Sequence, residues 1–155
     1  MIKINVITNN KNWLNYIKKP NYYLDKKIKK INSEVKRFKK KNIFCTLLLS
    51  GNKEIKYLNK KFRKKNKITD VLSFPSHEKN ELKKKLKREK ELYLGDIIIN
   101  LNKIKNKNIK KNFEIEFNRL WVHGLVHLFG HDHIKDKDFK KMYQVEKKYF
   151  ELVNG

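Results

Sequence analysis

The sequence has one cysteine, two prolines and five glycines in 155 residues, and only 16 acidic side chains against 40 basic ones. A single cysteine, Cys45, excludes an internal disulfide, and so excludes a disulfide-stapled secreted scaffold. No apolar run approaches the roughly 20 residues that a membrane-spanning helix needs. The first residues alternate apolar and polar side chains, unlike the apolar core of a signal peptide. These absences predict a cytoplasmic protein without a membrane span.

The shortage of acidic residues leaves a formal net charge of +24. Such a charge favours a polyanionic partner, and nucleic acid is the functional interpretation. The alternative is compositional bias, because lysine, asparagine and isoleucine are all used heavily, as in proteins from AT-rich genomes. Charge alone therefore does not choose among RNA, DNA and an acidic membrane surface.

Hydrophobic periodicity predicts a chain of alternating strands and helices. Alternating apolar residues over 1–8 predict a half-buried strand, and an apolar run over 43–49 predicts a buried one. Spacings of three and four predict an amphipathic helix from Pro20 to Phe38. The remaining predicted elements are a helix over 55–63, a strand over 69–75, a flexible or partly helical connection over 76–92, a strand over 95–99, a lysine-rich connection over 102–111 and a helix from about Asn112.

A last helix is predicted from Asp136 or Asp138, and its apolar stripe is formed by Phe139, Met142, Tyr143, Phe150 and Val153. Together these elements predict one α+β domain over residues 1–155, built on a mixed four-stranded sheet. The order of the strands in that sheet does not follow from the sequence.

The most informative stretch is 123–133, with the sequence HGLVHLFGHDH. His123 and His127 are four residues apart, so both imidazoles lie on one face of a helix. Gly130 can end that helix in the left-handed conformation, after which the chain can bring His133 to the same point. A lone histidine on an apolar face is usually a satisfied core residue, but three in this pattern predict a zinc site with an open fourth position.

The spacing of these histidines and of the glycine matches the zinc-protease pattern H-E-x-x-H-x-x-G-x-x-H except at Gly124. In the proteases a glutamate at that position is the general base. Because glycine has no side chain, the metal ligands are present and the peptidase base is absent. A metallopeptidase-like hydrolase remains one alternative. Another is a basic RNA- or ribosome-binding protein with structural zinc, although structural zinc usually has four protein ligands.

The motif H-G-x-x-H-x-x-G-x-D-H resembles the signature of the YbeY-like metal-dependent endoribonucleases, which are bacterial ribosomal-RNA maturation factors. Two more stretches agree with the family, Leu58-Asn59…Arg63…Thr69 to Pro75 and Leu94 to Ile99. The resemblance implies a zinc-dependent, single-strand-specific endoribonuclease that acts at the 3′ end of 16S ribosomal RNA and in ribosome biogenesis. It also implies one zinc per chain, the ribosome or its proteins as partners, and a zincin-like central helix that carries the histidines.

Arg63 is the candidate catalytic residue. Only four of the 40 basic residues are arginine, and a guanidinium can hold a phosphate through two parallel hydrogen bonds. The alternative is a cation placed only to interact with a helix end. The match to the functional arginine of the family favours catalysis. Three neutral ligands leave a zinc ion its full charge, which suits a phosphodiester; water and an adjacent 2′-hydroxyl both remain possible nucleophiles.

Three acidic residues, Asp70, Asp96 and Asp132, are candidates to orient the zinc ligands by accepting their second N–H. The alternatives are that Asp70 caps a strand end and that Asp96 shapes a turn. His131 could contact substrate or cover the metal. His77 lies in the charged connection and is predicted to be an exposed loop residue.

Overall fold

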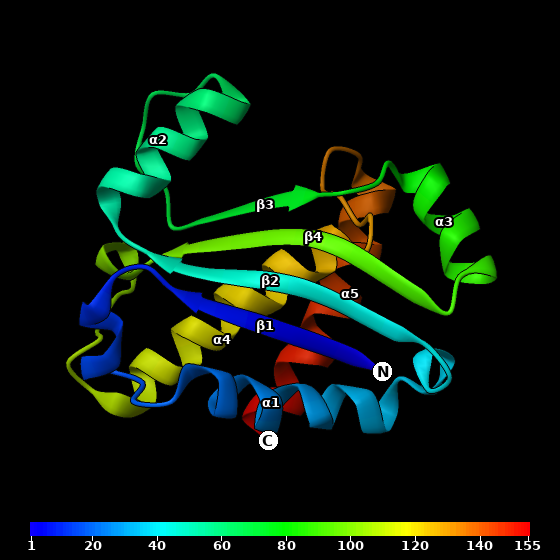
Figure 1. The fold of residues 1–155 in the computed structure, drawn as a ribbon, viewed down its shortest axis with the longest axis horizontal. Coiled ribbons are helices and arrows are strands. Elements are labelled where there is room, and N and C mark those ends of the chain that lie inside the picture. The colour runs from blue at the N-terminus through cyan, green and yellow to red at the C-terminus, as the bar shows by residue number, and fades with distance from the viewer.

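The computed structural model describes residues 1–155 as an α+β fold around one four-stranded sheet (Figure 1). The strands are β1 (Ile2–Thr8), β2 (Asn42–Ser50), β3 (Val71–Pro75) and β4 (Glu91–Asn100). They lie in the order β1-β2-β4-β3. Strands β1, β2 and β4 are parallel, and β3 runs antiparallel to β4. The predicted mixed sheet is confirmed.

Five α-helices and three short 3-10 helices complete the fold. They are α1 (Pro20–Glu34), α2 (Asn52–Arg63), α3 (Lys79–Arg88), α4 (Lys110–Leu128), α5 (Asp136–Asn154), η1 (Lys11–Asn15), η2 (Lys36–Phe38) and η3 (Leu101–Lys103). Helices α1, α4 and α5 pack together on one face of the sheet, and α2 lies on the opposite face (Figure 1). None of these helices combines the length and the apolar character that crossing a bilayer would require.

The main core fills the space between the sheet and helices α1, α4 and α5. Its aromatic centre is Trp13, Phe113 and Phe117, whose ring centroids lie 5.4–6.1 Å apart. The Trp13 indole N–H donates to the backbone oxygen of Ser50 at 2.9 Å, so this large side chain is buried with its polar group satisfied. A separate small cluster under α2 contains Ile55, Leu72 and Ile98. The larger core therefore lies around α4, the helix that carries the histidine motif.

Strand β4 contains a bulge where it meets the end of β3. Its register against β2 shifts between Phe44 and Thr46, so that two residues of β4 stand opposite one residue of β2. Gly95 lies at this point with a φ of 133°, and a Cβ on it would lie 2.1 Å from the backbone oxygen of Phe74. Only glycine permits this combination of conformation and close approach.

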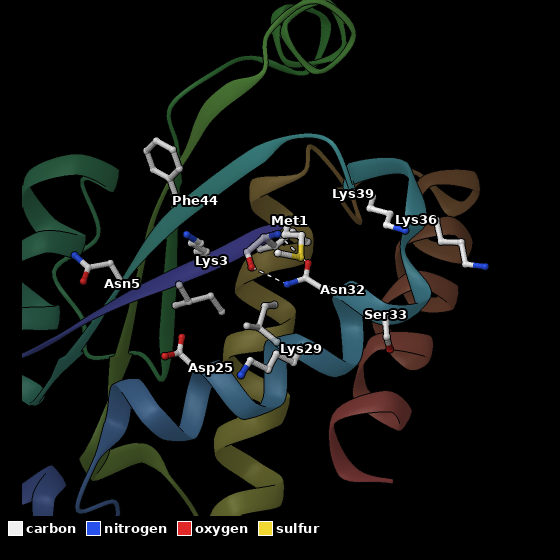
Figure 2. Close-up of a pocket in the computed structure, with 13 residues that line it drawn as sticks. Met1, Lys3, Asn5, Asp25, Lys29, Asn32, Ser33, Lys36, Lys39 and Phe44 are labelled. Carbon is white, nitrogen blue, oxygen red and sulfur yellow. Dashed lines mark hydrogen bonds between the residues drawn. The ribbon is translucent and has the colours of Figure 1, made fainter.

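Both outer edges of the sheet are hydrogen-bonded by side chains from helices. At the β1 edge, the Asn32 side chain accepts from the Ile2 N–H and donates to the Ile2 oxygen, both at 2.8 Å (Figure 2). Asn21 accepts from the β1 backbone at 3.0 Å. At the β3 edge, Arg63 Nη2 donates to the Ser73 oxygen at 2.8 Å. Side chains of α1 and α2 thus occupy three backbone groups of β1 and one of β3 with which a further strand could pair.

The predicted boundaries need correction in two places. The first helix ends at Glu34, not at Phe38, because Val35 leaves the helical conformation at ψ 74° and a 3-10 turn follows. The connection over 76–92 is partly helical, as one of its two interpretations predicted: it contains α3, to which Leu82 and Leu86 give an apolar face, and the start of β4. Strand β4 begins at Glu91, four residues before the predicted start, since Gly95 is an internal bulge.

Candidate metal centre

Helix α4 places the histidines because it is buried along most of its length. Its inner residues include Phe117, Trp121 and Leu125, all fully buried. Gly124 sits against the sheet, and a Cβ on it would lie 2.6 Å from Cγ2 of Ile97 in β4. Position 124 therefore faces the sheet at a distance that leaves no room for a side chain. Close packing against Ile97 therefore explains why glycine stands at the position of the protease glutamate.

The three predicted ligands come together at the C-terminal end of α4. His123 and His127 lie one turn apart on the helix, and Gly130, with a φ of 84°, reverses the chain after it. The Gly130 N–H donates to the His127 oxygen at 2.9 Å, which closes the helix end. His133 then returns to the pair, and one ring nitrogen from each of the three histidines lies within 4.8 Å of the others.

The hydrogen bonds of the helical pair fix which nitrogens can bind a metal. His123 Nδ1 lies 3.1 Å from Glu146 Oε1, and His127 Nδ1 lies 3.0 Å from the His131 oxygen. Both Nδ1 atoms therefore carry the proton in the neutral rings, and both Nε2 atoms are left as acceptors. These two Nε2 atoms are only 3.1 Å apart. Two lone pairs that face each other at this distance need a shared cation, so the donor set fits a metal ion.

Burial lowers the pKa of His127 below its ordinary value of 6.5, and nearby His123 lowers it further. A lower pKa keeps the imidazole neutral to a more acidic pH. A metal ligand must be in this state, because protonation would occupy the nitrogen that binds the ion. The electrostatics of the site thus agree with its geometry.

Glu146, the carboxylate that contacts a candidate ligand, was missed by the sequence analysis. The predicted stripe of α5 is partly wrong, since Phe139 and Tyr143 are more than half exposed. The buried stripe is instead Met142, Tyr149 and Val153. Glu146 falls on this stripe, four residues after Met142 and three before Tyr149. A charged residue at a core-facing position is a signal that a correct choice of helix face would have revealed.

The three predicted acidic candidates have other contacts. Asp70 accepts from the Val71 N–H at 2.7 Å, so it caps the start of β3, as the alternative interpretation proposed. Asp96 accepts from the Tyr93 hydroxyl on the sheet. Asp132 accepts from the N–H of His133 at 2.7 Å, where it shapes the loop that carries this third histidine.

Arg63 lies in the same cleft as the histidines. The cleft has a volume of about 810 Å³, and its walls come from the end of α2, from β3, from α3 and from the loop after α4. The guanidinium of Arg63 lies 5.6 Å from the centre of the Phe74 ring, and its one hydrogen bond within the chain goes to Ser73. This bond fixes the arginine at the strand edge while Nε and Nη1 remain free for a ligand.

Two further histidines line this cleft, and one of them departs from its prediction. His77 is not an exposed loop residue: its side chain is 17% exposed, and Nε2 lies 3.1 Å from the Tyr93 oxygen. Formation of α3 brings it inward, where Glu81 lies 3.4 Å from its Nδ1. His131 is half-buried, and burial lowers the pKa of its ring first, followed by the charges of nearby cations.

Comparison with known proteins agrees with the motif. A family model described as Endoribonuclease YbeY matches residues 7–154. The Endoribonuclease YbeY of Pelagibacter ubique is 44% identical over 156 residues, which cover 99% of this chain and 97% of the relative. That of Ehrlichia canis is 34% identical over 155 residues, covering 99% of this chain and 93% of the relative.

A solved structure supports the same relationship at the level of the fold. The solution structure of TM1509 from Thermotoga maritima matches with a TM-score of 0.59 and 29% sequence identity. The match covers 99% of this chain and 89% of the other. The arrangement of strands and helices around the histidine helix is therefore shared with an experimentally determined fold.

Proposed function

Since this chain belongs to the YbeY endoribonuclease family, we propose that it is a zinc-dependent, single-strand-specific endoribonuclease of ribosomal RNA maturation. The observation that carries the proposal is the convergence of His123, His127 and His133 in one cleft with Arg63. An RNA-cleaving activity follows from the family. The ion, the strand specificity and the RNA species are the proposed part.

Zinc is the proposed ion because three imidazole nitrogens are a ligand set typical of catalytic zinc sites. A zinc ion held there would supply a Lewis acid for a phosphodiester oxygen and would lower the pKa of a water molecule toward neutrality. Glu146 and the His131 oxygen hold the rings so that Nε2 of each helical histidine faces the cleft. We expect one ion per chain, with a fourth position left for water or substrate.

Arg63 is proposed to bind the scissile phosphate. Its guanidinium is fixed by Ser73 and lies over Phe74, so little side-chain entropy is lost on binding. The free N–H groups can donate to two phosphate oxygens, and they would stabilise the negative charge that gathers there in the transition state. The histidines and Arg63 would then hold the same phosphate from two sides of the cleft.

The proposal extends to the setting of the reaction. A single domain over residues 1–155 would act in the cytoplasm on precursors of ribosomal RNA, at the 3′ end of the 16S species. Its partners would be the ribosome or ribosomal proteins. The motif resemblance described above supports these points, and the charge of +24 is compatible with them because it favours an RNA-rich surface.

A peptidase is the weaker candidate. Position 124 faces Ile97 and not the cleft, so this chain has no side chain where the proteases have their general base. Glu146 does not replace that base, because it contacts His123 at Nδ1, the nitrogen that faces away from the cleft, and does not line the cleft itself. A protein with purely structural zinc is also disfavoured, since only three ligands converge.

An RNA cleavage assay on metal-stripped and then zinc-restored protein tests the proposal. We expect single-stranded RNA to be cut only after zinc is restored, while unstructured peptides survive. The variant His127→Ala should lose most of the bound zinc and the cleavage together. Chelator-sensitive peptide hydrolysis with intact RNA would reverse the ranking, and full cleavage by the stripped protein would remove zinc from the mechanism.

A further inference from the structure

A second, smaller pocket with a volume of about 250 Å³ adjoins the metal cleft. The two spaces share four wall residues, Lys79, Gly130, His131 and Asp132. On the basis of the proposed RNA cleavage, we propose that this second pocket binds one nucleotide of the RNA strand beside the scissile phosphate. Its phosphate would be held by Arg37, Lys83 and Lys141.

The cations of this pocket come from three separate elements of the chain. Arg37 belongs to η2, Lys79 and Lys83 lie one turn apart on α3, and Lys141 lies on α5. The carboxylates in the wall are Asp132 and Asp138. Their number is half that of the cations, so the pocket carries an excess of positive charge. A flexible anionic chain that leaves the metal cleft would be attracted to this wall.

Both carboxylates already have partners. Three of the four cations, Arg37, Lys83 and Lys141, are therefore not paired with a carboxylate of this pocket. Asp138 lies 3.9 Å from Lys79 Nζ, and Asp132 accepts from the backbone of His133. Neither residue forms an ion pair with Arg37 or Lys141. A phosphate entering the pocket therefore meets cations that it does not have to detach from carboxylates.

Arg37 is held by stacked aromatic rings at the side of the pocket. Its guanidinium lies 4.4 Å from the centre of the Phe38 ring, and Phe38 stacks on Phe129 with centroids 5.2 Å apart. Phe129 itself lines the pocket. This stacking positions a guanidinium with several N–H groups, the geometry that suits a phosphate. Arginine is rare in this chain, and the wall of each pocket contains one.

The lining of the pocket also has an apolar part. Leu82, Leu86 and Phe129 form it, and they suit a ribose or the face of a base better than a free inorganic anion. Gly130, one of the four residues that the two spaces share, contributes no side chain to the wall between them. A volume of about 250 Å³ is below the roughly 300–1,000 Å³ of pockets for drug-sized ligands. It suits one nucleotide unit.

Two triple variants with the same change in charge test the pocket. The first is Arg37→Gln/Lys83→Gln/Lys141→Gln; the second is Lys29→Gln/Lys105→Gln/Lys148→Gln, whose residues line neither space. Binding of a fluorescent single-stranded oligonucleotide is measured by anisotropy with metal-stripped protein, so no cleavage interferes. We expect the first triple to raise Kd about tenfold or more, and the second about twofold. The salt slope should fall by about 0.7 for each phosphate that the variant no longer neutralises.

A substrate series then shows where the pocket acts. A dinucleotide spans only the scissile bond, whereas a longer oligonucleotide also reaches the pocket. We expect the first triple to lower kcat/KM for the longer substrate about tenfold more than for the dinucleotide, mainly through KM. Equal losses on both substrates would mean that these cations act on the scissile phosphate itself, and the proposal would be wrong.

The remaining outcomes separate this proposal from the proposed function. Equal weakening by both triples would show that the pocket is part of a uniform basic surface, and the subsite would be rejected. The two triple variants could differ in Kd as expected while the wild-type protein never cleaves RNA. In that case the subsite stands and the endoribonuclease proposal fails. Single variants Lys83→Gln and Lys141→Gln change exposed side chains, so they keep the test available if Arg37→Gln disturbs the stacked aromatics.

Discussion

Each histidine on α4 depends on one hydrogen bond from the nitrogen that faces away from the cleft, and for His123 this partner is Glu146. Removing such a partner typically costs about 10–100-fold in metal affinity. We expect Glu146→Ala to lose zinc affinity within this range and Glu146→Gln to lose less, since the amide oxygen can still accept. Competition with a chromophoric chelator measures the change. The matched control is Glu151→Gln, an exposed residue five positions further along α5.

A normal zinc affinity in Glu146→Ala would show that His123 does not need its carboxylate partner. The orientation of the ring would then be set by packing alone. Glu151→Gln should behave like the wild-type protein, because the Glu151 side chain pairs only with Lys147, at 3.9 Å, on the same helix.

A substitution at Arg63 tests whether cleavage needs the shape of a guanidinium or only its positive charge. Arg63→Lys keeps the charge but loses the second N–H donor on the same plane. We expect kcat to fall by at least about tenfold, an increase in barrier of about 1.4 kcal/mol, with zinc content unchanged. Arg88→Lys, at the exposed end of α3, is the control. A change in RNA affinity with an unaltered kcat would assign Arg63 to the basic surface instead.

At the scale of elements, the contact between α4 and β4 controls where the metal site lies. Gly124→Ala would place a Cβ 2.6 Å from Ile97 Cγ2, and overpacking of this kind costs about 1–3 kcal/mol. The better helix propensity of alanine offsets at most about 1 kcal/mol of this loss in stability. We therefore expect a net loss of stability in chemical denaturation.

A double-mutant cycle identifies the cause of that loss. Ile97→Ala removes all three atoms that the new Cβ would meet, so Gly124→Ala should be less destabilising in the Ile97→Ala background. If the two changes are simply additive, the contact with Ile97 is not what requires glycine at position 124.

Strong local patterns allowed most helices and strands to be predicted. The boundaries that were predicted wrongly have physical causes. The helix at 55–63 and the histidine helix were predicted within a few residues because their apolar spacing is regular. The end of α1 was missed because neither glycine nor proline marks it. Strand β4 was shortened because Gly95 resembles a turn, whereas its positive φ serves a bulge.

The candidate site was predictable where the motif is local and not where it is assembled from distant elements. His123, His127 and His133 lie within one short stretch, so the sequence indicates their convergence. Glu146 comes from another helix, and its role depends on how α5 rotates against α4. The inward position of His77 depends on α3, and the lysine-rich sequence of that helix has too few apolar residues to predict it clearly. Long-range packing decides these positions.

At the scale of the whole molecule, the two outer strands can be tested for association. Asn32 bonds both backbone groups of Ile2, and an aliphatic side chain such as that in Asn32→Leu would leave them free. We expect a loss of about 1–3 kcal/mol in stability, because these part-buried groups lose their partner. We also expect concentration-dependent association by light scattering. Asn80→Leu, which changes an exposed asparagine of α3 away from the sheet edges, should not associate.

The hydrogen-bonded positions on the two sheet edges matter most when RNA is bound. The free protein carries a charge of +24, and mutual repulsion alone would keep its copies apart. A polyanion that bound several copies would cancel that repulsion. Colloidal protection by charge is then lost, but the asparagine and arginine bonds at the sheet edges remain. These four backbone groups would therefore stay unavailable to a neighbouring strand even in the crowded, neutralised state.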